Sequence, residues 1–161
     1  MDAVVQKTNA ARLLDAAGIS YTLVPYSYDP DDLAAQHVAE QLGEDISQVF
    51  KTLVLRGDRT EMFVCVVPGD MEVDLKVAAK LSGNKSCQML HVKELLPSTG
   101  YIRGGCSPIG MKKLFKTFIH ESAAELDTII FSAGKIGYQI ECPLSELQKV
   151  VPVQLADIIV K

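Results

Sequence analysis

The segment KTLVLRGDRTEMFVCVV, residues 51–67, decides the fold class because its pattern is that of a β-hairpin. Runs 51–56 and 61–67 consist mainly of residues that favour strands, and residues 57–60 between them have a length and composition suited to a turn. Both runs are strongly apolar, which predicts burial on both faces. A paired sheet is therefore expected at the centre of the protein.

Lys51 is the leading site candidate, because it opens an apolar run that extends over residues 49–55. Full burial there would strip its ammonium group of water at a large free-energy cost. We therefore expect Lys51 to lie at the mouth of a strand and to face an anionic group.

Helices and further strands are predicted on both sides of this hairpin. Thr8 is a suitable N-cap for the first helix, Gly18 ends it, and Pro97 is expected to end the fourth. Ser122 has the spacing of a capping box with the glutamate three residues later, so a helical turn is expected to start there. The predicted helices cover residues 8–17, 33–42, 75–81, 92–96 and 145–150, and the other predicted strands cover 21–28, 117–120, 128–132 and 138–142.

The order of these elements predicts an α+β fold with a mixed, curled, barrel-like β-sheet flanked by helices. Strands arrive in neighbouring pairs rather than in strict alternation with long helices. The chain has 161 residues, no internal repeat and no linker-like stretch. We therefore expect a single domain over residues 1–161.

Composition limits the class of protein and its partners. Apolar residues make up 48% and charged residues 22% of the chain, as in soluble globular proteins. A net charge of −4 argues against non-specific coating of DNA or RNA, which needs a broad basic surface. There is no export signal, no apolar run long enough for a membrane span and no CxxC pairing among the four cysteines, so a cytoplasmic protein with reduced thiols is expected.

The stretch GGCSPIG, residues 104–110, is the second candidate site. Its GxxxxG spacing lacks the lysine that a phosphate-binding P-loop needs directly afterwards, and it misses the GxSxG pattern of serine hydrolases by one residue. Gly104 and Gly105 have no side chains to block a ligand, so the backbone could approach one closely. A tight turn without a binding role is the alternative.

Other chemistry-bearing residues form no convincing constellation. Cys106 would need a base to act as a nucleophile, and the three histidines are scattered without metal-ligand spacing. Alternating carboxylates at residues 70–74 are expected to face water. No metal is therefore predicted, and any reaction should depend on substrate groups or positioned water rather than on a protein acid–base pair.

Three motifs together resemble the YbaK family of aminoacyl-tRNA deacylases. They are FKT at 50–52, GGCSPIG at 104–110 followed by two lysines, and SAGK at 132–135. Their order and spacing match over nearly the whole chain. The family is similar to the editing domain of bacterial prolyl-tRNA synthetases, and the SPIG version at 107–110 looks most like the branch that clears cysteine from proline tRNA.

The resemblance implies a pocket between the Lys51 strand and the Gly104 loop, with no metal or organic cofactor. Lys51 would hold the 3′-terminal adenosine or its phosphate, and Gly104 and Gly105 would offer N–H groups to the ester carbonyl. The attacking group would be the substrate's own thiol or a water aligned by the ribose hydroxyl. The substrate-binding residues that it implies are Tyr26, Leu33, Thr52, Ser107, Pro108, Ser132, Gly134 and Gln139.

The implied substrate is the acceptor end of a mischarged aminoacyl-tRNA, with prolyl-tRNA synthetase as a partner in a ternary complex. Leu33 and Gln139 could shift the amino-acid preference toward alanine or another small residue. Two other hypotheses about the function remain: a non-catalytic module that binds tRNA or a synthetase, and a cysteine hydrolase that uses Cys106.

Overall fold

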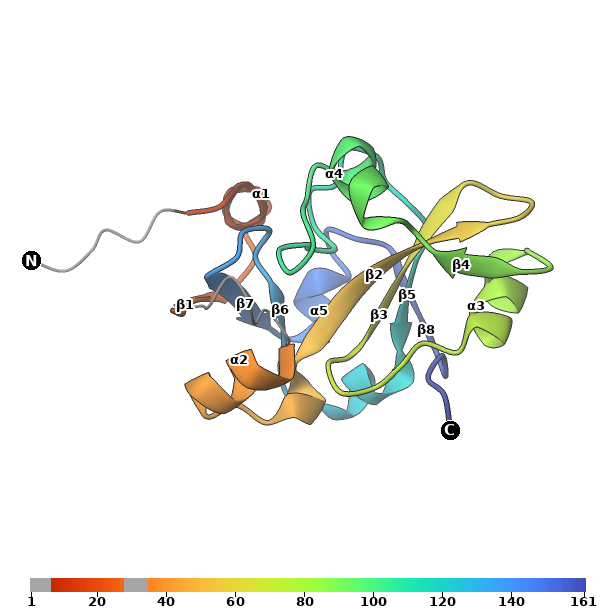
Figure 1. The fold of residues 1–161 in the computed structure, drawn as a ribbon. Coiled ribbons are helices and arrows are strands. Elements are labelled where there is room, and N and C mark those ends of the chain that lie inside the picture. Colours follow the sequence, from red (N-terminus) through yellow and green to blue (C-terminus); the bar gives the residue numbers. More distant parts are fainter. Residues whose placement is uncertain (1–6, 28–34) are drawn as a thin grey trace, which may run out of the picture.

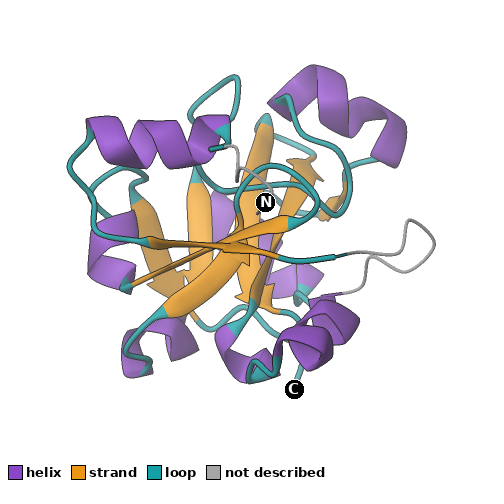
Figure 2. Ribbon diagram, turned by 90° about the vertical axis from the view of Figure 1, so that its left-hand side faces the viewer, coloured by secondary structure: helices purple, strands orange, loops and turns teal. Residues whose placement is uncertain are grey.

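The computed structural model describes residues 7–27 and 35–161. Its helices are short and lie around the outside of the strands (Figure 2). No helix in these two ranges has the length and apolar character needed to cross a membrane. The α-helices are α1 (Asn9–Ala16), α2 (Ala35–Leu42), α3 (Leu75–Ser82), α4 (Val92–Thr99) and α5 (Leu144–Leu147).

The strands form two sheets. The larger has the order β4-β2-β3-β5-β8, in which β4, β2 and β3 are antiparallel while β5 pairs in parallel with both β3 and β8. The smaller is antiparallel, with the order β1-β7-β6. Their bounds are β1 (Thr22–Pro25), β2 (Phe50–Gly57), β3 (Met62–Pro68), β4 (Cys87–Met89), β5 (Thr117–His120), β6 (Ile129–Ser132), β7 (Tyr138–Cys142) and β8 (Val153–Ala156).

The two sheets meet at the beginning of β2. A parallel bridge joins Val49 to Ile130, which places β6 beside β2 (Figure 1). The predicted α+β class is thereby confirmed, with the strands divided over two sheets. Curling of these sheets toward a barrel stays a prediction.

The hairpin of β2 and β3 is confirmed and forms the centre of the larger sheet. Its register runs from Phe50 opposite Pro68 to Arg56 opposite Met62. Alternate residues of β3 enter two separate hydrophobic clusters, Val64 and Val66 on one face and Phe63, Cys65 and Val67 on the other. Both faces are therefore buried, as the apolar content of the segment predicts.

Replacing Phe118 by alanine should lower the free energy of unfolding by about 3–5 kcal/mol. The Phe118 side chain on β5 is fully buried and meets the ring of Phe63 edge-on, with centroids 6.2 Å apart. Urea denaturation measures the change. Leu114→Ala is the control, since that side chain is 74% exposed and should cost less than about 0.5 kcal/mol. A Phe118→Ala variant within 1 kcal/mol of the parent would contradict this packing.

One predicted helix boundary and one predicted cap are wrong for identifiable reasons. α4 continues through Pro97 and ends at Gly100, whose φ of 88° gives the left-handed turn that closes the helix. Pro97 removes only one N–H donor, and the amide of Gly100 still bonds to the carbonyl of Leu96 at 2.8 Å. The helical turn expected at Ser122 is confirmed to within one residue as a 3-10 turn over Glu121–Glu125. Ser122 is not its cap, because its buried hydroxyl has no partner among the described residues.

The other predicted elements are confirmed to within a few residues. Thr8 caps α1, its hydroxyl accepting from the amide of Ala11 at 3.2 Å. The turn at 133–137 joins β6 and β7 as an antiparallel hairpin. α5 is shorter than predicted, the expected first residues of α2 lie outside the described ranges, and strands β4 and β8 are additions that the sequence pattern did not reveal.

Candidate functional site

A cleft of about 880 Å³ lies where the two sheets meet. Its walls come from β2 and β6, from β7, from the turn before α4 and α4 itself, and from the loop that carries Gly104. Six of the residues implied by the family resemblance line it. They are Tyr26, Lys51, Thr52, Gly104, Ser132 and Gln139.

Lys51 and Thr52 reach the same cleft although alternation along a strand sends their side chains to opposite faces. The explanation lies in the edge of β2. Strand β4 pairs only with Leu55 to Gly57, so the edge of β2 before Leu55 is left without a β4 partner. Consecutive residues of this edge segment, Val49 to Val54, therefore line the cleft.

The Lys51 ammonium lies at the cleft mouth, as its position in the sequence predicts. Its Nζ is 3.6 Å from Oε1 of Glu72, and the two side chains are 26% and 80% exposed. This pair is weak because the glutamate is largely in water. An anionic ligand in the cleft can therefore replace Glu72 at little cost.

The Thr52 hydroxyl is buried and has no hydrogen-bond partner among the described residues. Buried hydroxyl groups in folded proteins nearly always have one. Thr52 is also among the residues that line the cleft.

The two adjacent glycines of the loop at residues 104–110 have different surroundings. Gly104 is exposed, lines the cleft and has a φ of 84°. The Gly105 amide instead donates to the carbonyl of Ile102 at 3.0 Å, and a Cβ on Gly105 would lie only 3.2 Å from the amide nitrogen of Ile136. The N–H group of Gly105 is thus already bonded within the loop, and its lack of a side chain allows close packing. Donation from Gly105 to a substrate carbonyl stays a prediction.

Ser107, Pro108 and Gly134 do not line the cleft, contrary to their expected role in substrate binding. The Ser107 hydroxyl is fully buried and accepts from the amide of Ile109 at 3.3 Å. Pro108 lines a separate cavity of about 90 Å³. A Cβ on Gly134 would come within 2.8 Å of the ring of Tyr101, so this glycine also allows close packing.

Ser132 and Gln139 lie opposite each other on β6 and β7. The Ser132 hydroxyl accepts from the amide of Gly134 at 3.1 Å. Gln139 is 5% exposed, and its Nε2 donates to Oε2 and Oε1 of Glu44 at 2.9 and 3.1 Å. Tyr26 follows β1, its amide bonding to the carbonyl of Gly137 at 2.8 Å. Leu33 lies outside the described residues.

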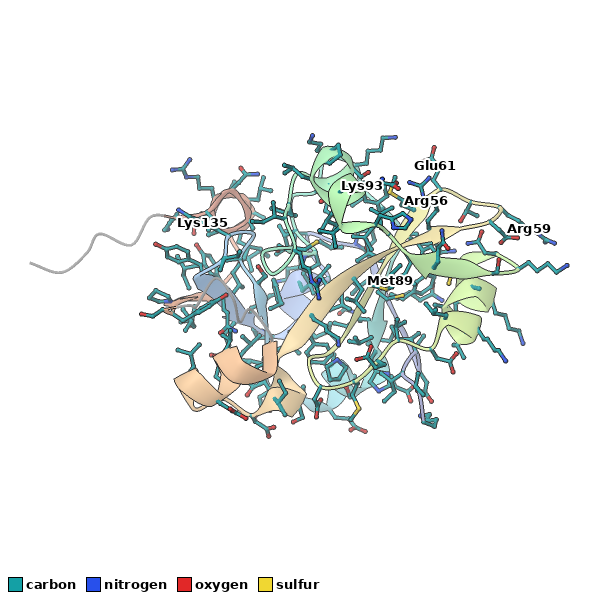
Figure 3. The ribbon with its side chains drawn as sticks, viewed as in Figure 1. Arg56, Arg59, Glu61, Met89, Lys93 and Lys135 are labelled. Carbon is teal, nitrogen blue, oxygen red and sulfur yellow. The ribbon has the colours of Figure 1, made fainter. Side chains whose placement is uncertain are left out.

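The sequence reasoning missed several residues at the cleft. Arg103 is exposed beside Gly104, and Glu44 is placed behind Gln139. An apolar wall comes from Met89, Leu90, Val92 and Leu95. Figure 3 shows Met89 on β4 and Lys93 on α4, across the molecule from Lys135 in the turn between β6 and β7. Arg103 could have been found because it directly precedes the glycine pair, whereas Glu44 has no local sequence signal.

Cys106 lines the cleft but is not suited to be a nucleophile. Burial raises the pKa of its thiol to about 12, so it is protonated at neutral pH. Among the described residues that line the cleft there is no histidine, and the acidic one is Glu72. No group of three or more metal-binding side chains occurs in the described ranges.

The Cys106→Ala variant should therefore keep the deacylase activity that the family resemblance implies within about threefold of the parent. Iodoacetamide should also leave the activity of the parent unchanged. Mass spectrometry of the treated protein checks the second result, with the less buried Cys87 as the thiol expected to react first. Loss of activity on alkylation of Cys106, reproduced by Cys106→Ala, would restore the cysteine-hydrolase reading.

Comparison with known proteins identifies the family. Residues 29–150 match the family described as the aminoacyl-tRNA editing domain. EbsC of Enterococcus faecalis (strain ATCC 700802 / V583), named as a candidate Cys-tRNA(Pro)/Cys-tRNA(Cys) deacylase, is 47% identical over 156 residues, which cover 97% of this chain and 95% of EbsC. The proline–tRNA ligase of Thermosipho africanus (strain TCF52B) is 32% identical over 87 residues, 54% of this chain and 15% of the ligase.

A solved structure shows the same fold. The crystal structure of a candidate trans-editing enzyme for prolyl-tRNA synthetase superposes with a TM-score of 0.83 at 21% identity, covering 97% of this chain and all of the other. The chain belongs to the aminoacyl-tRNA editing domain family.

Proposed function

We propose that the protein is a free-standing aminoacyl-tRNA deacylase that removes cysteine from mischarged proline tRNA. The observation that carries this proposal is the cleft in which Lys51, Thr52 and Gly104 converge without a histidine or an acid–base pair among its described lining residues. Such a site suits an ester that is already activated by its ribose. The name of EbsC supports cysteine as the amino acid.

The size of the cleft fits this substrate. Ligand pockets typically measure about 300–1,000 Å³, and 880 Å³ leaves room for a terminal adenosine together with a small amino acid. Lys51 holds the adenosine or its phosphate, where it replaces Glu72 as the neighbour of an anion. Thr52 offers its unpartnered hydroxyl to the same end of the substrate.

Cleavage then needs only alignment and stabilisation of negative charge. The N–H group of Gly104 faces the ester carbonyl and stabilises the oxyanion as it forms. Either a water molecule or the thiol of the cysteinyl group attacks the carbonyl carbon, and the ribose oxygen leaves with the proton that the attacking group gives up. The products are tRNA and free cysteine in the first case, or tRNA and a cyclic thioester in the second.

Editing of this kind is needed because one methylene group or a similar small change alters binding by only about 1–3 kcal/mol. A synthetase that accepts proline therefore also admits smaller residues. We further propose that the whole chain forms one editing domain and that prolyl-tRNA synthetase supplies the tRNA selectivity. This protein has a net charge of −4, and it therefore lacks the broad basic surface that would hold the rest of the tRNA.

The test is release of labelled amino acid from charged tRNA by the purified chain. Rapid loss of cysteine from proline tRNA, with slow loss of alanine and of correctly attached proline, supports the proposal. Faster loss of alanine would change the substrate within the same family, and no loss of either would favour a non-catalytic binding module. Repeating the assay with cysteine on its own tRNA, with and without prolyl-tRNA synthetase, shows whether the synthetase protects the correctly charged species.

A further inference from the structure

The cleft contains a cation, Arg103, that has no carboxylate partner among the described residues. The charged side chains among the described lining residues are Lys51, Glu72 and Arg103. Lys51 and Glu72 pair with each other at 3.6 Å, whereas no described carboxylate pairs with Arg103, which is exposed. The guanidinium group is therefore available to an anionic ligand.

Arg103 is carried by a tight turn over residues 102–105. The amide of Gly105 bonds to the carbonyl of Ile102 at 3.0 Å. Gly104 has a φ of 84°, while no described residue other than glycine has a positive φ. These features define a type II turn with Arg103 and Gly104 as its two central residues. The side chain of Arg103 and the backbone of Gly104 therefore reach the cleft from the same tip.

Both ends of this turn are fixed. Tyr101, directly before the turn, is 8% exposed. Its amide donates to the hydroxyl of Thr99 at 3.0 Å, and its own hydroxyl donates to the carbonyl of Ile109. At the other end, Gly105 packs against Ile136. The tip is thus held in place beside the cleft, so a ligand that binds there orders little additional backbone.

The acceptor end of a tRNA brings one phosphate for each nucleotide. This end is single-stranded, and proteins hold single strands with cations that follow the backbone and with surfaces on which bases stack. In the proposed function Lys51 neutralises one anion of the ligand, which leaves the next phosphodiester group without a cation. An arginine suits that group, because its planar guanidinium group can donate two hydrogen bonds to one phosphate.

We propose that Arg103 binds a phosphodiester group of the single-stranded acceptor end, at one of the last two linkages of the chain. This inference rests on the proposed function and adds a binding group to it. Because Gly104 follows Arg103 in the same turn, a phosphate held here brings the ester into the part of the cleft that contains the Gly104 amide. A cysteinyl ester of free adenosine, which has no phosphate, is consequently a poor substrate.

The experiment uses a short hairpin RNA with the acceptor stem and single-stranded 3′ end of proline tRNA. An acylation ribozyme attaches cysteine, so no synthetase has to recognise an altered RNA. Each of the last two phosphodiester linkages is replaced in turn by an uncharged methylphosphonate, with a 2′-O-methyl group on the neighbouring ribose to keep the linkage stable. The reference RNA has the same 2′-O-methyl group and a normal phosphate. Release of cysteine is measured for the parent and for Arg103→Gln.

Arg103→Gln should raise KM by about tenfold or more and keep kcat within about threefold of the parent, because a lost phosphate contact weakens ground-state and transition-state binding alike. The slope of log kcat/KM against log salt concentration should become shallower by about 0.7, as for one contact to a single strand. One of the two methylphosphonates should lower kcat/KM of the parent by about tenfold. The same methylphosphonate should change kcat/KM of Arg103→Gln by less than about twofold, because the contact is already lost.

Arg59→Gln is the matched control. Arg59 is exposed in the turn between β2 and β3, outside the residues that line the cleft, and Figure 3 shows it at the outer end of this hairpin. The variant loses the same charge, and it should keep the KM, the salt slope and the methylphosphonate sensitivity of the parent. Arg103→Lys should lie between the parent and Arg103→Gln, since it keeps the charge and loses the paired hydrogen bonds.

Equal losses from both methylphosphonates in the parent and in Arg103→Gln would overturn the assignment, because the arginine would then touch neither phosphate. A KM of Arg103→Gln within threefold of the parent would overturn it as well. So would a variant that stays sensitive to both methylphosphonates but no longer responds to removal of a base from this end, which indicates stacking. Failure of the parent to release cysteine from the unmodified RNA would instead contradict the proposed function itself.

Discussion

Replacing Lys51 by alanine should lower kcat/KM for release of cysteine from proline tRNA by about 100-fold or more. The ammonium group is the basic side chain of β2 at the cleft, and its loss leaves the substrate anion opposite Glu72 alone. The fold should survive, since the Glu72 side chain is 80% exposed and an ion pair screened by water in this way contributes about 0–1 kcal/mol. Single-turnover deacylation and thermal unfolding are measured together.

Lys76→Ala provides the control for Lys51→Ala. Lys76 is an exposed lysine on α3 outside the residues that line the cleft, so the variant loses the same charge and should keep full activity. Lys51→Arg should recover part of the lost activity because it restores the charge. Activity of Lys51→Ala within tenfold of the parent would remove Lys51 from the mechanism.

Replacing Gly104 by alanine should lower kcat by about 10- to 100-fold with a smaller change in KM. The φ of 84° at this residue is unfavourable for a side chain, so the loop should shift and turn the N–H group away from the developing oxyanion. Because this donor acts mainly in the transition state, the loss should appear in kcat. Steady-state kinetics on the cysteinyl ester separates the two constants.

Gly83→Ala is the control for Gly104→Ala, because it makes the same substitution at a glycine outside the cleft. Gly83 ends α3 with a φ of 82°, and a Cβ there meets nothing within 4 Å. Both residues have a positive φ, so each variant should lose about 1 kcal/mol of stability through backbone strain. If Gly83→Ala lost as much activity as Gly104→Ala, the effect would be one of stability and not of the N–H group.

Local sequence patterns predicted the parts of the site that depend on local geometry. Lys51 could be recognised because burying an unpaired ammonium group costs free energy, so a lysine that opens an apolar strand is expected at the end of that strand. The hairpin at 51–67 followed from its turn composition and strand length. Ser132 and Gln139 were expected at the site only because of the family resemblance, and the local pattern around them predicted no more than two strands joined by a turn.

Contacts between distant segments were beyond these patterns. Glu44 and Gln139 are 95 positions apart, and neither has a neighbour that signals the pair. The glycine motifs did not show which glycines face a ligand. Gly104 faces the cleft, whereas Gly105 and Gly134 allow close packing against Ile136 and Tyr101. Both situations require the absence of a Cβ, so the sequence alone cannot distinguish them.

The sequence pattern did not predict strands β4 and β8, which are short and lie at the two edges of the larger sheet. Their side chains are exposed or half-buried, so neither strand shows the apolar alternation of a strand with one buried face. The helix boundary at Pro97 was misplaced because a single lost donor does not outweigh the closure of the helix at Gly100.

Strand β2 connects the cleft to the buried core, whose backbone hydrogen bonds are expected to break only when the whole protein unfolds. Lys51 and Thr52 belong to the same hairpin strand as Phe50 and Val54, which are buried in the main core cluster. Segments of this kind exchange their amide hydrogens only when the whole molecule unfolds. The cleft floor is consequently preorganised before the acceptor end arrives, and binding need not be accompanied by ordering of the strand that carries Lys51.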